Sequence, residues 1–106
     1  MEQGELWERS CSPEALRFEV WHQQNPEVYR LFKRFAGEGI RAGRKHLGTN
    51  MIIERIRWYS AVETTGDIYK INNNFAPYYA RMFMKDFPQY DGFFRTRKSK
   101  ADGEEE

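Results

Sequence analysis

The fold class is decided by residues 25–35, which read NPEVYRLFKRF. Asn25 and Pro26 are a helix-start signal, because Asn caps helices well and Pro fits the first helical position. Apolar side chains then recur at the spacing of one helix face: Val28, Leu31, Phe32 and Phe35. The other face is basic: Arg30, Lys33 and Arg34. This pattern predicts an amphipathic helix, which we expect to end near Ala42 among several glycines.

Similar signals flank this helix on both sides. Ser12-Pro13-Glu14 predicts a short helix that reaches Gln24, and Thr49 is placed to cap a third helix over Asn50–Ser60. A fourth helix is expected from about Ala76 to Phe87, because Asn73 or Asn74 can cap its start and Pro88 ends it. The apolar segment 90–94 is expected to pack back on the helices.

The segment between the third and fourth helices has a different pattern. Residues 60–72 contain β-branched and aromatic side chains around the turn signal Thr65-Gly66-Asp67, which predicts a two-stranded hairpin. Three helices followed by a hairpin give the order of a winged helix-turn-helix. We therefore predict a mainly α single domain with a small β-hairpin over residues 12–97, between a loose arm (1–11) and a charged, disordered tail (98–106).

Charge is unevenly distributed along the 106 residues, although the formal net charge is only +1. Residues 27–100 hold 15 basic and 7 acidic side chains, a net +8, whereas residues 1–26 carry −3 and residues 101–106 carry −4. A small domain with this excess of cations attracts polyanions, of which nucleic acid is the commonest. This positive charge also excludes an acidic inhibitor that mimics DNA.

Several other classes are excluded by the sequence. No apolar run is long enough for a membrane-spanning helix, and the acidic N-terminal residues lack the pattern of a signal peptide. A single cysteine, Cys11, fits a reducing cytoplasm. Two histidines and scattered carboxylates do not make a zinc or two-metal site, and no glycine-rich phosphate loop follows a strand. We expect a cytoplasmic protein that is not an enzyme and holds no metal or cofactor.

Basic and amide side chains occupy the positions that a DNA-binding winged helix would use. In that geometry the third helix enters the major groove and its side chains approach base edges. The candidate base readers are Asn50, Arg55 and Arg57. The candidate phosphate contacts are Arg41, Arg44, Lys45 and Lys70. Double-stranded DNA is therefore the first predicted partner.

A second class, a protein-binding inhibitor or adaptor, uses the same basic surface against an acidic protein. Its candidate interface residues, which also allow a homodimer, are apolar side chains that one helix face does not bury: Trp58, Tyr78 and Met84. The run Asn72-Asn73-Asn74 has two interpretations, a junction that caps the next helix and a set of amides that contact a partner. The junction is the favoured one.

The chain also resembles a group of small uncharacterised proteins encoded by bacteriophages and prophages. The resemblance covers about three-quarters of the chain and rests on these motifs: Trp21-His22, Asn25-Pro26-Glu27-Val28-Tyr29, Lys45-His46, Ile53-Glu54-Arg55-Ile56-Arg57-Trp58, Lys70-Ile71-Asn72-Asn73-Asn74 and Tyr78-Tyr79-Ala80-Arg81. It implies a bacterial host cell and adds no activity or site residue. It favours two classes, phage DNA-binding regulators and small inhibitors of host defence.

Overall fold

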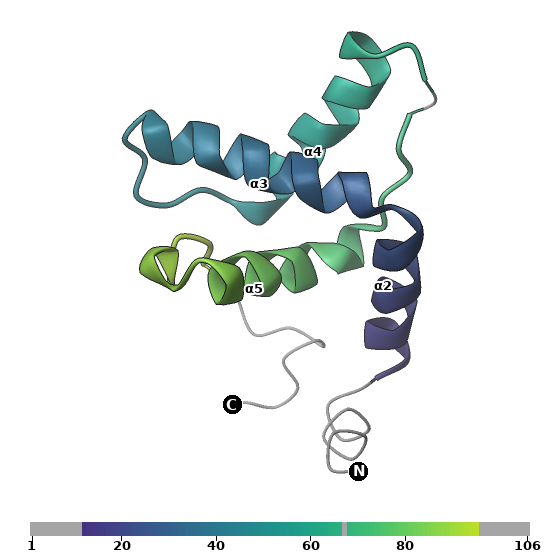
Figure 1. Ribbon diagram of the computed structural model, residues 1–106, viewed down its shortest axis with the longest axis horizontal. Coiled ribbons are helices and arrows are strands. Elements are labelled where there is room, and N and C mark those ends of the chain that lie inside the picture. Colours follow the sequence, from purple (N-terminus) through teal and green to yellow (C-terminus); the bar gives the residue numbers. More distant parts are fainter. Residues whose placement is uncertain (1–11, 67, 96–106) are drawn as a thin grey trace.

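The computed structural model describes residues 12–66 and 68–95 and is built from short helices (Figure 1). Four α-helices are α2 (Pro13–Gln24), α3 (Pro26–Arg41), α4 (Thr49–Trp58) and α5 (Ala76–Asp86). Three single turns are the π-helical η1 (Tyr59–Glu63) and the 3-10 helices η2 (Asn73–Phe75) and η3 (Pro88–Tyr90). The predicted arm (1–11) and the predicted tail (98–106) both lie outside the described residues.

Helices α2 and α3 begin where their caps predict. The Ser12 hydroxyl accepts a hydrogen bond from the Ala15 amide at 3.1 Å, which satisfies one free N–H of the first turn. Asn25 alone separates the two helices; its backbone N–H and its side-chain amide both donate to the carbonyl of Trp21, at 2.8 and 3.0 Å. Pro26 then starts α3, so the corner between the helices is tight.

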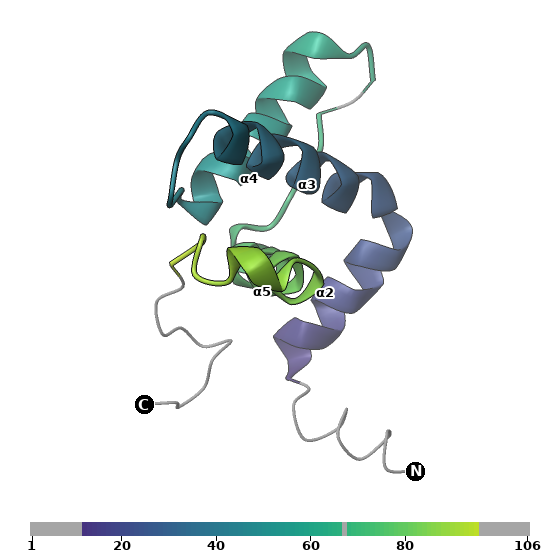
Figure 2. The ribbon, with the colours of Figure 1, turned by 60° about the vertical axis from the view of Figure 1, so that its left-hand side comes forward.

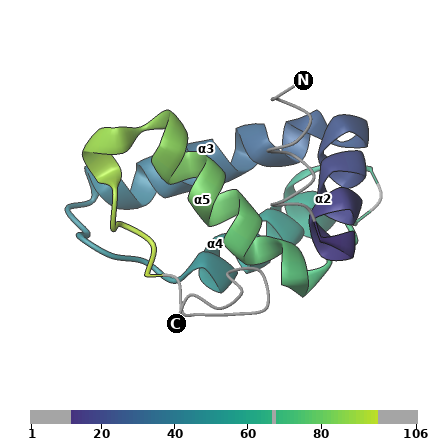
Figure 3. The ribbon, with the colours of Figure 1, turned by 90° about the horizontal axis from the view of Figure 1, so that it is seen from below.

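The core lies where α5 crosses α3 and α4 (Figures 2 and 3). Seven of its residues have no exposed surface: Val28, Phe32, Ala36, Ile53, Ile56, Tyr79 and Ala80. The ring of Tyr79 is at its centre, 5.4 Å from Phe32 and 4.9 Å from Phe18 between ring centroids. Helices α2, α3 and α5 therefore share one aromatic core, to which α4 adds its isoleucines.

The segment after α5 packs back, as the sequence predicts. Phe93 and Phe94 are buried, and the Phe94 ring lies 5.2 Å from Phe32. The Phe93 carbonyl accepts from the Leu47 amide at 3.2 Å, and Leu47 forms an isolated parallel bridge with Phe94. A Cβ added at Gly39 would lie 2.4 Å from Leu47, so glycine lets the end of α3 approach the α3–α4 connector.

The predicted winged helix is wrong, because the described residues contain no β-strand ladder. Residues expected to form the first strand instead extend α4: Tyr59 keeps right-handed helical geometry and the π-helical turn runs to Glu63. The return segment 68–72 therefore has no partner strand. Its backbone is held by side chains, since the Tyr69 amide donates to the buried Ser60 hydroxyl at 3.0 Å.

Other boundaries need smaller corrections. Helix α4 begins at Thr49 after Gly48, so Thr49 is inside the helix and makes no side-chain cap. Helix α5 ends at Asp86, two residues before Pro88. None of the helices in the described ranges combines the length and the apolar composition needed to cross a bilayer.

Candidate nucleic-acid interface

Among the described residues, exposed cations are concentrated along α3 and its end. We call this surface the basic ridge and define it by six residues: Arg30, Lys33, Arg34 and Arg41 on α3, with Arg44 and Lys45 directly after it. All six are exposed. The connector that carries the last two turns back beside the end of α3 (Figure 1).

Helical geometry explains why the α3 cations share one face. Val28, Phe32 and Phe35 are directed into the core, so the residues half a turn away face solvent. At a rise of about 1.5 Å per residue, Arg30 and Arg41 are separated by about 16 Å along the helix. Four cations are thus spread over a length comparable to several phosphates of one DNA strand, which recur about every 3.4 Å.

Aromatic rings beneath the ridge position two of the cations. The Lys33 ammonium lies 4.8 Å from the centroid of the Tyr29 ring. The Arg34 guanidinium lies 5.3 Å from Phe35 and 5.4 Å from Tyr59. A cation at this distance is attracted by the ring quadrupole, which limits the number of rotamers that the side chain visits. Arg34 also approaches the Glu38 carboxylate at 3.8 Å, and this surface pair contributes little.

Gly43 fixes the position of Arg44 at the end of α3. The Arg44 amide donates to the Gly39 carbonyl and the Gly43 amide to the Ile40 carbonyl, both at 3.0 Å, which is a Schellman motif. Gly43 takes the required positive φ of 92°. The motif therefore joins Arg44 rigidly to the helix that holds the other ridge cations.

Arg57, a predicted base reader, is bound within the protein. Its guanidinium donates to Glu54 at 2.6 Å, to the Asn73 side-chain oxygen at 2.8 Å, and to the Ile71 carbonyl. These contacts connect α4 to the return segment. Reading a guanine would require two of the same donors, so DNA binding through Arg57 would compete with the fold.

Arg55 is also committed to protein groups. One nitrogen donates to Glu63 at 3.1 Å, and the guanidinium lies 4.3 Å from the centroid of the Phe35 ring. The two remaining predicted contacts are exposed and lie apart. Asn50 is in the first turn of α4, close to the connector, whereas Lys70 is on the return segment at the opposite end of the molecule from the connector (Figure 1).

The Asn72–Asn74 run forms a junction in the structure. The Asn72 side chain accepts from the Asn74 amide at 2.8 Å and caps η2, and Asn73 binds Arg57. No residue other than glycine has a positive φ in the described ranges, so the three asparagines keep ordinary backbone geometry. Helix η2 leads directly into α5.

The three predicted interface residues differ in exposure. Trp58 is 59% exposed. Tyr78 stacks on Phe18 with centroids 5.2 Å apart, and Met84 accepts from the Gly92 amide at 3.1 Å through its sulfur. Contacts within the chain therefore cover much of Tyr78 and Met84, whereas Trp58 is open to a partner.

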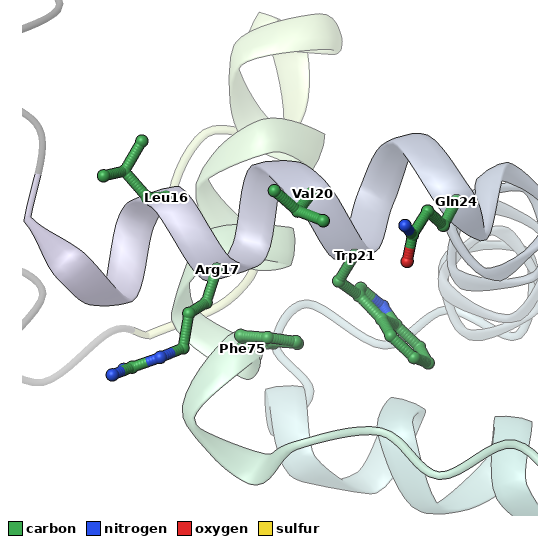
Figure 4. A pocket seen from close by; sticks show the side chains of 6 residues that line it. All are labelled: Leu16, Arg17, Val20, Trp21, Gln24 and Phe75. Carbon is green, nitrogen blue, oxygen red and sulfur yellow. The ribbon is translucent and has the colours of Figure 1, made fainter.

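A shallow apolar groove lies between α2 and the start of α5 (Figure 4). It has a volume of about 450 Å³ and is lined by Leu16, Arg17, Val20, Trp21, Gln24 and Phe75. The figure shows Trp21 and Phe75 along one side of α2, with Arg17 beside Phe75. Arg17 is the one cation among these lining residues, so the groove would bind a polyanion only weakly.

The hydroxyl groups of the two buried tyrosines, Tyr79 and Tyr29, form hydrogen bonds within the protein. Burial raises the pKa of Tyr79 to about 12, although the hydrogen bond from Trp21 at 2.8 Å opposes this shift. Burial also raises the pKa of Tyr29, and its bond to Asp86 at 2.6 Å adds to the effect. Both hydroxyls stay protonated at neutral pH. The described residues contain no group of three His, Cys, Asp or Glu side chains placed to bind a metal ion.

Comparison of the chain with protein-family models, with curated proteins and with solved structures finds no match in any of the three. The resemblance to phage-encoded proteins therefore stays a prediction.

Proposed function

We propose that this protein binds double-stranded DNA through the basic ridge, by contacting phosphates. The observation that carries the proposal is the alignment of four exposed cations over about 16 Å of one helix face. Arg44 and Lys45 extend this face at the end of the helix. Cations spaced in this way neutralise several neighbouring phosphates at once, and the release of counterions then drives binding.

A duplex fits the ridge better than a single strand does. Proteins that bind single strands use exposed aromatic rings on which the bases stack. The rings beneath the ridge, Tyr29 and Phe35, are buried. Phosphate contacts are therefore the interaction that the ridge offers.

The predicted sequence readout receives less support than the phosphate contacts. Arg55 and Arg57 are held by Glu63 and by the return segment, which leaves Asn50 as the exposed member of the three proposed base readers. We therefore expect binding that discriminates weakly between sequences. A regulatory role would then require high local concentration or a second contact.

The test is fluorescence anisotropy with a labelled random duplex at about 50 and 200 mM salt. If about six phosphates are contacted, the affinity falls roughly a thousandfold between these salt concentrations. The triple variant R30Q/K33Q/R41Q removes three ridge charges and should lower the slope of log K against log salt by about 2.7. No binding at the lower salt concentration would refute the proposal.

The matched control is R17Q/K70Q/K85Q, which removes three exposed cations outside the ridge. It has the same net charge as the ridge variant, so long-range attraction falls equally in both. We expect its salt slope to stay within about one unit of the original. Equal slopes for the two variants would show that net charge alone attracts DNA and that the ridge is not the site.

A second candidate function is the binding of an acidic protein by the same ridge, and exposed Trp58 favours it as an anchor at the edge of such an interface. Binding of one defined protein from a host lysate, lost in the ridge variant and unaffected by added DNA, would favour this candidate.

A further inference from the structure

Three large apolar side chains are exposed on the outward side of α4 and η1, beside the exposed carboxylate of Glu54. Met51, Trp58 and Val62 are 60%, 59% and 59% exposed, on the side opposite the buried isoleucines of α4. Large exposed side chains of this kind carry a cost in water, and three on one helix face indicate an interaction surface. Figures 1 and 2 show that the end of α4 and η1 project beyond the other helices.

Arg55 lies between Met51 and Trp58 along the edge of this side that faces α3, where its guanidinium contacts Phe35. We call the four residues the α4 stripe: Met51, Arg55, Trp58 and Val62. Their spacings along the chain are four, three and four residues. This order of spacings is the same in both directions, so the stripe matches an antiparallel copy of itself.

The chemistry of the stripe is self-complementary in that arrangement. An antiparallel copy places Met51 against Val62 of the partner subunit, and Arg55 against Trp58 of the partner subunit. The first pair is apolar, and the second is a guanidinium on indole, the strongest cation–aromatic pairing. Because a two-fold axis relates the copies, each of these contacts forms twice.

Arg55 is already held in place for this contact. Phe35 lies against its guanidinium and Glu63 accepts one of its N–H groups, while 36% of the side chain is exposed. A planar guanidinium has two faces, so a ring on one side leaves room for a second ring on the other. Little rotamer entropy is then lost when the partner's Trp58 docks.

We propose that the α4 stripe is a homodimer interface in which two copies of α4 and η1 pair antiparallel. The contact is a single pair of short helices, so its area is below the roughly 1,200 Å² of stable complexes and the dimer is weak. We expect a dissociation constant on the order of 100 µM. This inference does not rest on DNA binding.

Sedimentation equilibrium between about 5 and 500 µM protein tests the dimer. The wild type should shift from 12.7 kDa towards twice that mass as concentration rises. W58S should raise the dissociation constant at least about tenfold, because it removes the aromatic anchor. A monomer at every concentration would overturn the proposal.

The control variant is V20S, which removes a comparably exposed apolar side chain, 53% exposed, in the α2 groove. Its dissociation constant should stay within about twofold of the wild type. An equal rise of the dissociation constant in V20S and W58S would show that the chains associate through non-specific hydrophobic contacts, and would overturn the proposal. Circular dichroism checks that both variants are folded, as expected for exposed positions.

Disulfide trapping tests the antiparallel direction. In a C11S background, M51C and V62C are purified separately and then oxidised alone or as an equal mixture. In an antiparallel pair position 51 faces position 62 of the partner subunit, whereas like positions are separated by about 16 Å, too far for a disulfide. Cross-links should therefore form mainly in the mixture. Equal or faster cross-linking of each variant alone would overturn the antiparallel arrangement.

Discussion

Helices α3 and α4 pack on each other and share one core, yet they present opposite chemistry to solvent. The outer face of α3 is basic, whereas the outer face of α4 and η1 carries Met51, Trp58 and Val62. The arginines of α4 do not compensate, because Arg55 and Arg57 are bound to protein acceptors. A cation therefore contributes to a phosphate-binding surface only when its N–H donors are still available.

The largest effect on stability is expected from a substitution in the core that both helices share. Phe32 is fully buried against Tyr79 and Phe94, so F32A should destabilise the fold by about 3–5 kcal/mol and abolish both outer faces together. Urea unfolding followed by circular dichroism measures the change. M51A, on the exposed side of α4, is the control and should stay within about 0.5 kcal/mol of the wild type.

A second pair of variants compares one arginine from each helix. R57A leaves the Ile71 carbonyl and the Asn73 side chain without their donor, so we expect a loss of about 1–3 kcal/mol. R30A removes an exposed ridge cation and should change stability by less than about 0.5 kcal/mol. Urea midpoints report both values. Equal losses would contradict the division between structural and available arginines.

Alkaline pH tests the hydroxyl that lies at the centre of the core. The pKa of Tyr79 is raised by burial to about 12, while the unfolded state keeps the ordinary value of 10.0. The unfolded chain therefore loses this proton first, and the stability present below pH 10 declines between about pH 10 and 12. We expect Tyr79 alone to account for a loss of about 1 kcal/mol by about pH 11, measured as the difference between the wild type and Y79F in urea curves. In Y79F the part of the decline that comes from this group should disappear.

The smallest expected effect concerns the end of α3. Gly43 has a φ of 92°, so G43A should cost about 1 kcal/mol through left-handed strain. Since the Schellman motif positions Arg44, the same variant should weaken duplex binding slightly. G48S is the control at the start of α4, where φ is −76°, and should be neutral or stabilising by a few tenths of a kcal/mol. Thermal unfolding measures the stability of both variants.

Sequence signals located all four α-helices of the described residues to within two residues at each end. Ser12-Pro13 and Asn25-Pro26 mark the starts of α2 and α3, and α3 adds an apolar spacing that only a helix satisfies. The cap expected for α5 from Asn73 or Asn74 is not used, because the N-cap of α5 is Phe75 and makes no side-chain hydrogen bond. The return of the segment 90–94 to the core also followed from its aromatic residues. These are local properties, which is why a linear pattern reveals them.

The hairpin prediction failed because local propensity was overridden by tertiary contacts. Residues 60–72 are rich in β-branched side chains, yet Ser60 is buried and bonds the Tyr69 amide, while Arg57 bonds the carbonyl of Ile71. These partners are 9 and 14 residues apart, and no linear pattern marks them. Because the sequence does not reveal the partners of Arg57, it predicts that this side chain is available to DNA.

The candidate site was only partly visible in the sequence. Arg41, Arg44 and Lys45 were selected and belong to the ridge. The sequence predicts Arg30, Lys33 and Arg34 as the basic face of α3, but the expected winged-helix order places the DNA contacts on and around the third helix. A helical wheel of α3 combined with the Gly43 cap would have found all six.

Phe94 closes the aromatic core from the far end of the described chain, with 1% of its surface exposed and rings from Phe32 and Phe83 around it. During synthesis, Phe32 leaves the ribosome long before Phe94 does. The growing chain therefore presents an unfilled aromatic surface until its last described residues emerge, and chaperones can recognise that surface. Completion of the core therefore waits for a segment far from Phe32 in the sequence, although the helices themselves can form earlier.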